Sequence, residues 1–207
     1  MYKLYNFPGA GGIAIEAALI DAAIPFELIN VALEKPSEDT DWYDDINPRS
    51  QVPALQLADK SIITESAAIL IHLADAHPQA KLAPPPGSSE RAHMLRWLLF
   101  FAVNVYEGEL RRHYADRYTQ DPAGIDAVAA AAADHVEANY ALFEASLGNG
   151  PYYLGEQICI LDYYVWMLSY WVGDRTWITE KCPKIERLTE AVRSRPLIAP
   201  LHHAQLA

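Results

Sequence analysis

The chain has 207 residues, of which 51% are apolar and 21% charged, and its formal charge is −11 at pH 7. A chain of this length buries roughly two thirds of the surface that its unfolded form exposes, so it needs neither a metal nor a disulfide for stability. Sixteen Lys and Arg against 27 Asp and Glu argue against binding to phosphate backbones and anionic membranes, which attract basic stripes. We expect no nucleic-acid partner and no membrane partner.

The cysteines and the N-terminus narrow the class further. Cys159 and Cys182 lie far apart and outside any Cys/His cluster, which excludes a disulfide framework and an ordinary zinc site. We therefore expect no metal. The start of the chain lacks a charged region followed by an apolar one, and no apolar run approaches the roughly 18 residues that span a bilayer. We expect a soluble, cytoplasmic protein.

The first part of the chain alternates strand and helix patterns. Helix patterns occupy residues 13–23 and the stretch from Glu65 to about His77. A strand, a helix and a strand within about thirty residues predict a parallel pair. The last two strand patterns predict a β-hairpin before the second helix. The strand patterns are those of residues 3–7, 26–31, 52–57 and 60–64.

Residues 77–88, HPQAKLAPPPGS, hold four prolines and a glycine and predict a linker. We place it at 79–87, between a first domain of residues 1–78 and a second of residues 88–207. After the linker the apolar spacing is helical, so we expect an α/β domain followed by an all-α domain. The expected helices cover residues 88–118, 126–147, 161–172 and 183–194.

Two details of the second domain can be predicted as well. Cys159 and Asp162 have the spacing of a helix N-terminal capping box, which is a folding device and not a catalytic one. His202 and His203 lie in the C-terminal tail, where we expect them to be exposed.

The segment around Pro53 carries chemical information. Proline directly before a hairpin strand is tolerated mainly at an edge or a strand start, so a trans proline that opens the strand is the simpler interpretation. The alternative is a cis Val52–Pro53 bond. Such a bend exposes the backbone of Val52 to a groove, where an extended peptide can pair with it.

Thr64-Glu65-Ser66 precedes the second helix. We expect Ser66 to cap this helix and Glu65 to lie beside its exposed N–H groups. A helix N-terminus favours an anion such as a ligand carboxylate, and Glu65 can receive a ligand's ammonium group. The simpler alternative is an ordinary cap without a ligand.

Together these features resemble the cytosolic glutathione S-transferases over nearly the whole chain. The matching segments are QVPAL at 51–55, ESAAI at 65–69, the proline-rich linker, and LGEQ at 154–157 leading to Asp162. The start, KLYNFPGAGG, is most similar to the bacterial beta class and neighbouring bacterial groups. The resemblance implies a thioredoxin-like N-terminal domain that binds glutathione and an all-helical C-terminal domain that forms the pocket for an electrophile.

By this resemblance, Val52 pairs its backbone with the cysteinyl part of glutathione. Glu65 and Ser66 hold the γ-glutamyl ammonium and carboxylate, with Gln51 beside them. Lys35 corresponds to a lysine that reaches the glycine carboxylate, although a solvated surface lysine explains it equally well. The expected glutathione-binding residues are Lys35, Gln51, Val52, Pro53, Glu65 and Ser66.

The thiol-activating residue departs from the beta-class pattern. That class has a cysteine near the sulfur, where this chain has Gly11 followed by Gly12, so no mixed disulfide can form there. Backbone N–H groups of Gly11, Gly12 and Ile13 at a helix N-terminus can stabilise a thiolate. We expect the Asn6 amide or the Tyr5 hydroxyl to assist. A core tyrosine and a turn-forming asparagine are the structural alternatives for these two.

By the same resemblance, Tyr106, on the first helix of the second domain, lies where beta-class members place polar residues that face the sulfur, and we expect it to donate to the substrate or its leaving group. The leading hypothesis is a glutathione S-transferase that uses glutathione as co-substrate against small, mostly apolar electrophiles, as in detoxification. The alternatives are a glutathione-dependent disulfide or peroxide reductase and a non-catalytic binding protein of the same fold. The resemblance also implies a homodimer, formed through helices around residues 69–76 and 94–101.

Overall fold

The structure, a computed structural model, describes residues 1–32 and 41–206. It divides into one compact unit of residues 1–83 with 193–207 and another of residues 84–192. The final segment thus groups with the first unit, which differs from the expected second domain of residues 88–207. One physical reason is the ion pair between Arg195 Nε and Asp21 Oδ2 at 2.6 Å, which attaches this segment to the first unit.

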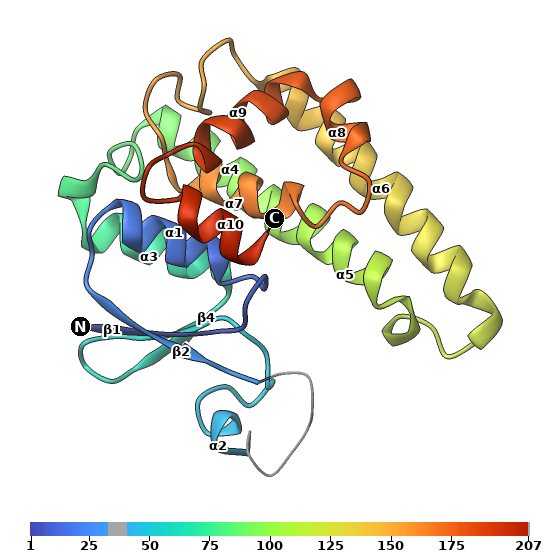
Figure 1. The fold of residues 1–207 in the computed structure, drawn as a ribbon, viewed down its shortest axis with the longest axis horizontal. Coiled ribbons are helices and arrows are strands. Elements are labelled where there is room, and N and C mark those ends of the chain that lie inside the picture. The colour runs from blue at the N-terminus through green and yellow to red at the C-terminus, as the bar shows by residue number, and fades with distance from the viewer. Residues whose placement is uncertain (33–40, 207) are drawn as a thin grey trace. The chain divides into compact units, whose positions relative to one another are not determined.

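In its described residues, the first unit contains a four-stranded sheet of order β2-β1-β3-β4 (Figure 1). β1 pairs with β2 in parallel and with β3 in antiparallel, and β3 pairs with β4 in antiparallel. The predicted parallel pair and the predicted hairpin are both confirmed. The elements are β1 (Tyr2–Asn6), α1 (Ile13–Asp21), β2 (Phe26–Asn30), α2 (Asp41–Asp44), β3 (Ala54–Gln56), β4 (Ile62–Thr64), α3 (Ser66–Ala76) and α10 (Ala199–Gln205).

Two boundaries in this unit differ from the expected ones. The Val52–Pro53 bond is cis, the alternative to the trans proline, and β3 begins only at Ala54 because proline has no N–H for a ladder bond. Glu65 is the N-cap residue of α3, and Ser66 is its first helical residue. The expectation that Ser66 caps this helix is therefore wrong, because the non-helical backbone, with φ +65°, lies at Glu65.

The helices and strands of the first unit both contribute buried apolar residues to its core. All residues of α1 from Ile13 to Leu19 are buried, and α1 packs against α3 (Figure 1). Leu4 and Leu55, on adjacent strands, are fully buried as well. A helix buried on every side must satisfy any charge that it carries, which makes Glu16 of α1 noteworthy.

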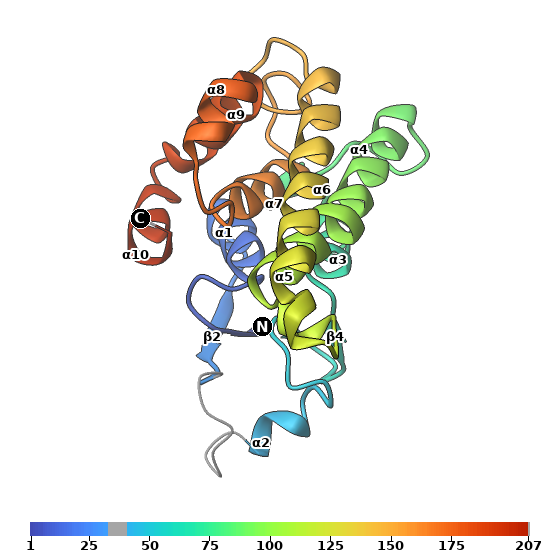
Figure 2. The ribbon, with the colours of Figure 1, turned by 90° about the vertical axis from the view of Figure 1, so that its right-hand side faces the viewer.

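The C-terminal tail of the first unit was not predicted to be structured. It forms α10 beside α1 (Figures 1 and 2). His202 is only 9% exposed, so its expected exposure is wrong, whereas His203 is exposed as expected. Burial of His202 follows from the packing of Ile198 and Leu201, which are also buried.

The second unit is helical in its described residues, as predicted. α5 and α6 run side by side along it (Figure 2), and Gly108 allows their close approach because a Cβ there would lie 2.6 Å from Val136 Cγ2. None of the helices in the described part of the chain has the length and apolarity to cross a membrane. The helices are α4 (Ser89–Phe100), α5 (Glu107–His113), α6 (Ile125–Ser146), α7 (Ile160–Ser169), α8 (Thr176–Lys181) and α9 (Pro183–Arg193).

The first long helix predicted in this unit, at residues 88–118, is interrupted. A π-helical segment, Phe101–Tyr106, separates α4 from α5. Within it the side-chain Nδ2 of Asn104 donates to the backbone oxygen of Phe100 at 3.0 Å. Short π-helical segments are rare and frequently occur at functional sites, and this one ends at Tyr106.

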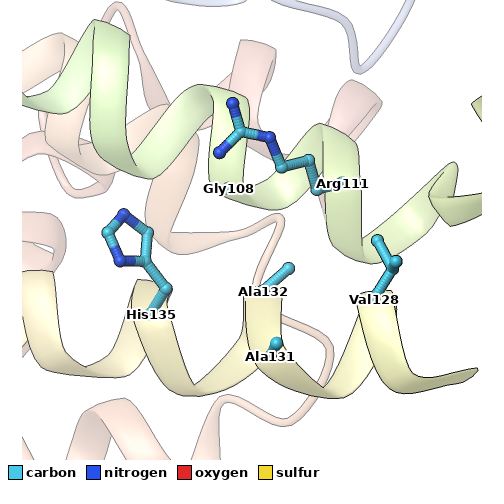
Figure 3. A pocket seen from close by; sticks show the side chains of 6 residues that line it. All are labelled: Gly108, Arg111, Val128, Ala131, Ala132 and His135. Carbon is cyan, nitrogen blue, oxygen red and sulfur yellow. The ribbon is translucent and has the colours of Figure 1, made fainter. Parts of the chain in front are cut away.

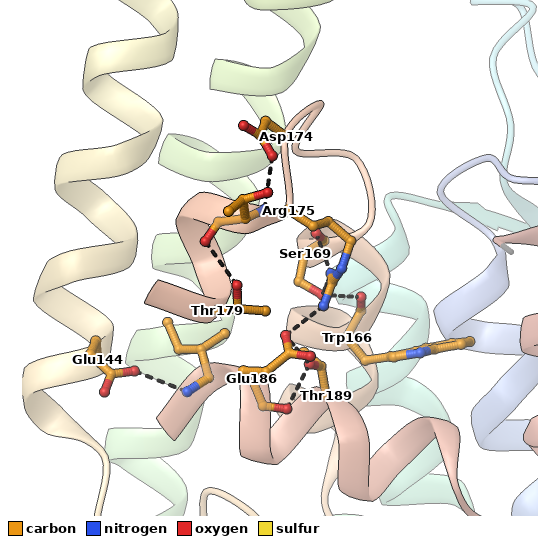
Figure 4. Close-up of polar contacts among 10 residues, drawn as sticks. Glu144, Trp166, Ser169, Asp174, Arg175, Thr179, Glu186 and Thr189 are labelled. Atoms are coloured by element: carbon orange, nitrogen blue, oxygen red, sulfur yellow. Dashed lines mark hydrogen bonds and ion pairs between the residues drawn. The ribbon is translucent and has the colours of Figure 1, made fainter. Parts of the chain in front are cut away.

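Polar contacts fix the ends of the later helices. The Asp162 carboxylate accepts the backbone N–H of Cys159 at 2.7 Å and of Tyr153 at 2.8 Å, so the predicted helix-capping role of Asp162 is confirmed. Arg175 Nη2 lies 2.6 Å from Glu186 Oε2 on α9, and its Nη1 donates to the backbone oxygen of Ser169 on α7 (Figure 4). This guanidinium therefore joins α7 to α9.

Glu109 on α5 is a buried carboxylate with two ion-pair partners on its own helix. Its carboxylate is fully buried, 3.3 Å from His113 Nε2 and 3.8 Å from Arg112 Nη1. Among the described residues, neither its oxygens nor the buried Tyr140 hydroxyl has a hydrogen-bond partner. Burial raises the pKa of Glu109, and the charges of Arg112 and His113 oppose this shift only in part.

The raised pKa of Glu109 predicts a pH dependence of stability. An acid whose pKa is higher in the folded state contributes stability at low pH, which is lost as the pH rises through the folded pKa. We expect Glu109→Gln to gain free energy of unfolding relative to wild type as the pH rises from about 5 to about 8, by about 1 kcal/mol. Denaturant unfolding at both pH values measures this difference. Glu107→Gln, at a neighbour whose side chain is 40% exposed, is the control. An equal difference at both pH values contradicts the prediction.

Candidate functional site

The strand register brings the predicted residues of the first unit to one end of the sheet. Tyr5 of β1 is opposite Ala54 of β3, which is opposite Thr64 of β4. Asn6, the Val52–Pro53 bond and Glu65, which follow or precede these three residues, therefore lie at the same end of the sheet. Adjacent strands are about 4.8 Å apart, so the end of the sheet is about 10 Å wide from β1 across β3 to β4. An extended tripeptide has a similar length.

Asn6, the last residue of β1, is fixed by the start of α1. The backbone N–H of Gly12 donates to Asn6 Oδ1 at 3.1 Å, and the Asn6 side chain is buried. A Cβ at Gly12 would lie 2.3 Å from Asn6 Cγ, so only glycine fits. The amide oxygen of Asn6 is thereby used, and its amide nitrogen is the donor that this side chain can offer.

The backbone donors at the start of α1 are partly engaged. The N–H of Gly12 is bonded to Asn6, and the N–H of Ile13 donates to the backbone oxygen of Ala10 at 3.1 Å. The expectation that these two groups hold a thiolate must therefore be revised, because each already has an acceptor. Gly11 is buried, while Gly9 and Ala10 before it are partly exposed.

Tyr5 lies in an aromatic cluster in the first unit. Its residue is 5% exposed, and its ring is 5.9 Å from the ring of Tyr43 and 6.1 Å from that of Trp42. Val31 and Ala54 complete the buried part of this cluster. This position corresponds to the structural alternative, a core tyrosine.

The chain before Val52 is held by two side chains that donate to one carbonyl. The Tyr43 hydroxyl and Asn47 Nδ2 donate to the backbone oxygen of Gln51 at 2.9 and 2.6 Å. Burial of the hydroxyl raises the pKa of Tyr43 to about 12, with a smaller opposing effect of the bond to Asn47. Tyr43 therefore remains a neutral donor. Gln51 itself is exposed, Val52 is half-buried and Pro53 is buried.

Glu65 has an unusual backbone conformation and forms an exposed ion pair with Arg49. Its φ of +65° is uncommon for a residue with a side chain, and such strain is frequent at ligand sites. Arg49 Nη1 lies 3.5 Å from Glu65 Oε1, and the two side chains are 66% and 71% exposed. The pair thus presents both signs of charge to solvent beside the start of α3, where Ser66 is buried.

The two remaining predicted site residues are Lys35 and Tyr106. Lys35 lies outside the described residues. Tyr106 belongs to the second unit, where its ring stacks on that of Tyr164 at 6.3 Å and meets that of Trp171 edge-on at 4.9 Å. It is half-buried, at the end of the π-helical segment.

A cavity of about 320 Å³ lies between α5 and α6 in the second unit (Figure 3). Arg111 and His135 bring polar groups to a lining that is otherwise of small apolar side chains, and none of the predicted site residues belongs to it. Among the residues that the structure describes, no group of three or more His, Cys, Asp and Glu is placed to hold a metal. The lining residues are Gly108, Arg111, Val128, Ala131, Ala132 and His135.

Sequence reasoning missed the supporting residues of the site. Tyr43 and Asn47 act on the carbonyl of Gln51 from outside the recognised motif. Arg49, two residues before Gln51, carries one of the few positive charges of an acidic chain. This positive charge, which follows a run of acidic residues, was the one sequence feature that could have indicated Arg49 as a ligand-binding residue.

Two family models match the chain. The model for the glutathione S-transferase N-terminal domain matches residues 15–76, and that for the glutathione S-transferase C-terminal domain matches residues 109–201. A GST-like protein of Escherichia coli whose function is uncharacterised is 29% identical over 197 residues, which are 95% of this chain and 94% of that protein.

Solved structures agree with this assignment. A glutathione transferase homologue from Sulfitobacter with bound glutathione has a TM-score of 0.88 and 25% identity, over 100% of this chain and 99% of the other. A beta-class glutathione S-transferase of Sphingomonas chungbukensis has a TM-score of 0.81 and 26% identity, over 98% of both chains. With both domain models matched in chain order and full-length structural agreement, the chain belongs to the glutathione S-transferase family.

Proposed function

We propose that this protein binds glutathione across the end of the sheet in its first unit, where Asn6, the Val52–Pro53 bond and Glu65 lie, and activates the thiol for attack on small, mostly apolar electrophiles. One observation carries the proposal. The strand register aligns Asn6, the Val52–Pro53 bond and Glu65 at one end of the sheet, at spacings that suit an extended tripeptide. The glutathione bound in the Sulfitobacter homologue supports the choice of ligand.

The charged end of glutathione matches the charge pair beside α3. Its γ-glutamyl group carries an ammonium and a carboxylate on one carbon. Glu65 receives the ammonium, while Arg49 and the N-terminus of α3 at Ser66 receive the carboxylate. The backbone of Val52, next to Pro53 and Gln51, pairs with the cysteinyl residue as an added strand. Lys35 keeps its proposed role at the glycine carboxylate.

The thiol then lies toward Asn6 and the start of α1. We propose that the Asn6 amide nitrogen and the Gly11 N–H donate to the thiolate, whereas Gly12 acts by holding the Asn6 side chain. Each hydrogen bond to an anion contributes about 1.5–3 kcal/mol, enough to lower a thiol pKa by about one unit or more. Tyr106 is proposed to donate to the electrophile, and Tyr5 to support the fold of the site.

Neither cysteine of the chain is suited to redox chemistry. Cys159 and Cys182 are fully buried and free. Burial raises the pKa of both thiols, that of Cys182 to about 12, and a thiol that stays protonated is a poor nucleophile. A disulfide or peroxide reductase activity would therefore have to use glutathione thiols alone. We infer a cytoplasmic protein, where free thiols persist.

The proposed role of Glu65 can be tested by the affinity for glutathione. We expect Glu65→Gln to weaken glutathione binding about tenfold, because a hydrogen bond between charged groups is lost. Stability should change little, since the exposed Arg49 pair contributes less than about 1 kcal/mol. Calorimetric titration with glutathione measures the affinity. Glu27→Gln removes a comparable exposed pair with Lys3 and is the control. Equal affinity of Glu65→Gln and wild type contradicts the assignment.

The proposed role of Asn6 can be tested by the pKa of the bound thiol. In wild type we expect the pKa of bound glutathione to lie below the free value of about 8.5, as measured by ultraviolet titration. Asn6→Ala should raise it by about one unit because one donor to the sulfur is lost. Tyr5→Phe should leave it unchanged. If glutathione binds wild type with an unchanged pKa, the transferase mechanism fails and the non-catalytic binding protein takes its place.

We further propose that the protein is a homodimer. Leu99 and Val103, at the end of α4 and in the π-helical segment, are 53% and 64% exposed, and Leu142 of α6 is 58% exposed. Helix residues four apart share a face, and exposed apolar side chains are suited to an interface between copies. By contrast, Ile69 and Leu73 of α3 are buried inside the first unit.

This proposal predicts a solution mass of about twice 23.1 kDa for wild type, by light scattering after gel filtration. Val103→Glu should shift the mass to that of the monomer, because a charge would be buried at the interface. Leu197→Glu, at another exposed leucine, should leave the mass unchanged. A monomeric wild type contradicts the proposal.

A further inference from the structure

We propose that Gln205, on the C-terminal helix α10, is a positioning residue for the loop between β1 and α1. This loop carries Gly11, so the catalytic consequence of the inference rests on the proposed function. The structural part of it, that Gln205 holds the loop, stands on contacts inside the first unit alone.

The first contact is made to the loop itself. The backbone N–H of Gly9 donates to Gln205 Oε1 at 3.2 Å. Gly9 has a φ of +75°, and a Cβ there would lie 3.5 Å from the Gln205 backbone oxygen. The end of α10 therefore lies directly against this turn. Gly12 on the far side of the loop is bonded to Asn6, so the segment that carries Gly11 is held from both sides.

The second contact is made to a buried charge. Glu16 of α1 is only 6% exposed, and Gln205 Nε2 donates to Glu16 Oε2 at 3.1 Å. Burial raises the pKa of Glu16, and the hydrogen bond from Gln205 opposes this. A buried carboxylate needs such a donor. Glu16 in turn fixes the orientation of the Gln205 amide.

The chemistry requires an amide at position 205. Its oxygen faces an N–H donor and its nitrogen faces a carboxylate, so each end of the amide meets the group that it can bond. A glutamate at this position would still accept from Gly9, but it would place a second carboxylate against Glu16. A methionine of similar size would make neither bond.

The helix that carries Gln205 is anchored independently of it. Arg195 Nε lies 2.6 Å from Asp21 Oδ2, at the end of α1. Ile198, Leu201 and His202 are buried. Loss of the Gln205 contacts should therefore release the loop without detaching α10, which makes substitutions at this residue informative.

The test uses four variants of the full chain. Gln205→Met removes both hydrogen bonds, and Gln205→Glu adds the repulsion from Glu16. The double variant Glu16→Gln/Gln205→Glu restores both bonds with the amide and the carboxylate exchanged, at unchanged net charge. His203→Ala, at an exposed neighbour, controls for general disturbance of the tail. The exchange pair makes the test independent of whether Gln205→Met folds.

Two readouts separate the inference from the proposed function. Hydrogen exchange of the Gly9 amide reports the loop directly, and we expect it to accelerate about tenfold in both single variants and to recover in the double variant. In the glutathione reaction we expect kcat to fall about three- to tenfold in the single variants. KM for glutathione should stay within about twofold, the pKa of the bound thiol should rise, and the double variant should recover.

Unchanged Gly9 exchange in the single variants, or no recovery in the double variant, overturns the proposed hold on the loop. Faster Gly9 exchange with unchanged kcat and thiol pKa overturns the positioning role. A wild type that binds no glutathione overturns the proposed function, and Gly9 exchange alone then decides whether Gln205 positions the loop.

Discussion

The hydrogen bond from the Gly12 N–H to the Asn6 side chain joins the end of β1 to the start of α1. The proposed site depends on it, because it sets where the first strand ends and the first helix begins. The bond needs an asparagine whose amide oxygen is turned inward and a residue without a Cβ opposite it. A side chain at position 12 would collide with that amide. The pattern therefore works as a pair, and neither residue can be understood without the other.

Burial determines which polar groups are available for chemistry. The carbonyl of Gln51 accepts two hydrogen bonds, from Tyr43 and Asn47, which hold the backbone just before Val52. Arg49 and Glu65 remain largely exposed, and their charges face solvent. A strongly acidic protein can attract an anionic tripeptide only through such local features, because its overall field repels anions.

In the second unit, buried polar groups differ in whether they have hydrogen-bond partners. Arg175 is bonded to Glu186 and to the backbone of α7, which satisfies its charge. Glu109 and Tyr140 remain without hydrogen-bond partners in the described part of the unit, and burial raises the pKa of each. The same helical bundle thus contains one hydrogen-bonded charge cluster, at Arg175, and one buried carboxylate, Glu109, whose oxygens accept no hydrogen bond among the described residues. The π-helical segment before α5 is the irregularity that presents Tyr106 among aromatic rings.

The sequence by itself determined the order of elements and the ends of the sheet. Strand and helix periodicities predicted the parallel pair, the hairpin and most of the second-unit helices, because apolar spacing directly encodes which face is buried. The segments QVPAL and ESAAI located Val52, Pro53 and Glu65, because the backbone conformation at these positions depends mainly on neighbouring residues.

Tertiary structure decided what sequence spacing does not encode. Tyr5 proved to be in a buried aromatic cluster, and the N–H of Gly12 proved to be engaged by Asn6. The contacts of Gln205 with Gly9 and Glu16 join residues nearly two hundred positions apart. Such contacts form only when folding brings distant segments together, so they cannot be predicted from a local sequence pattern.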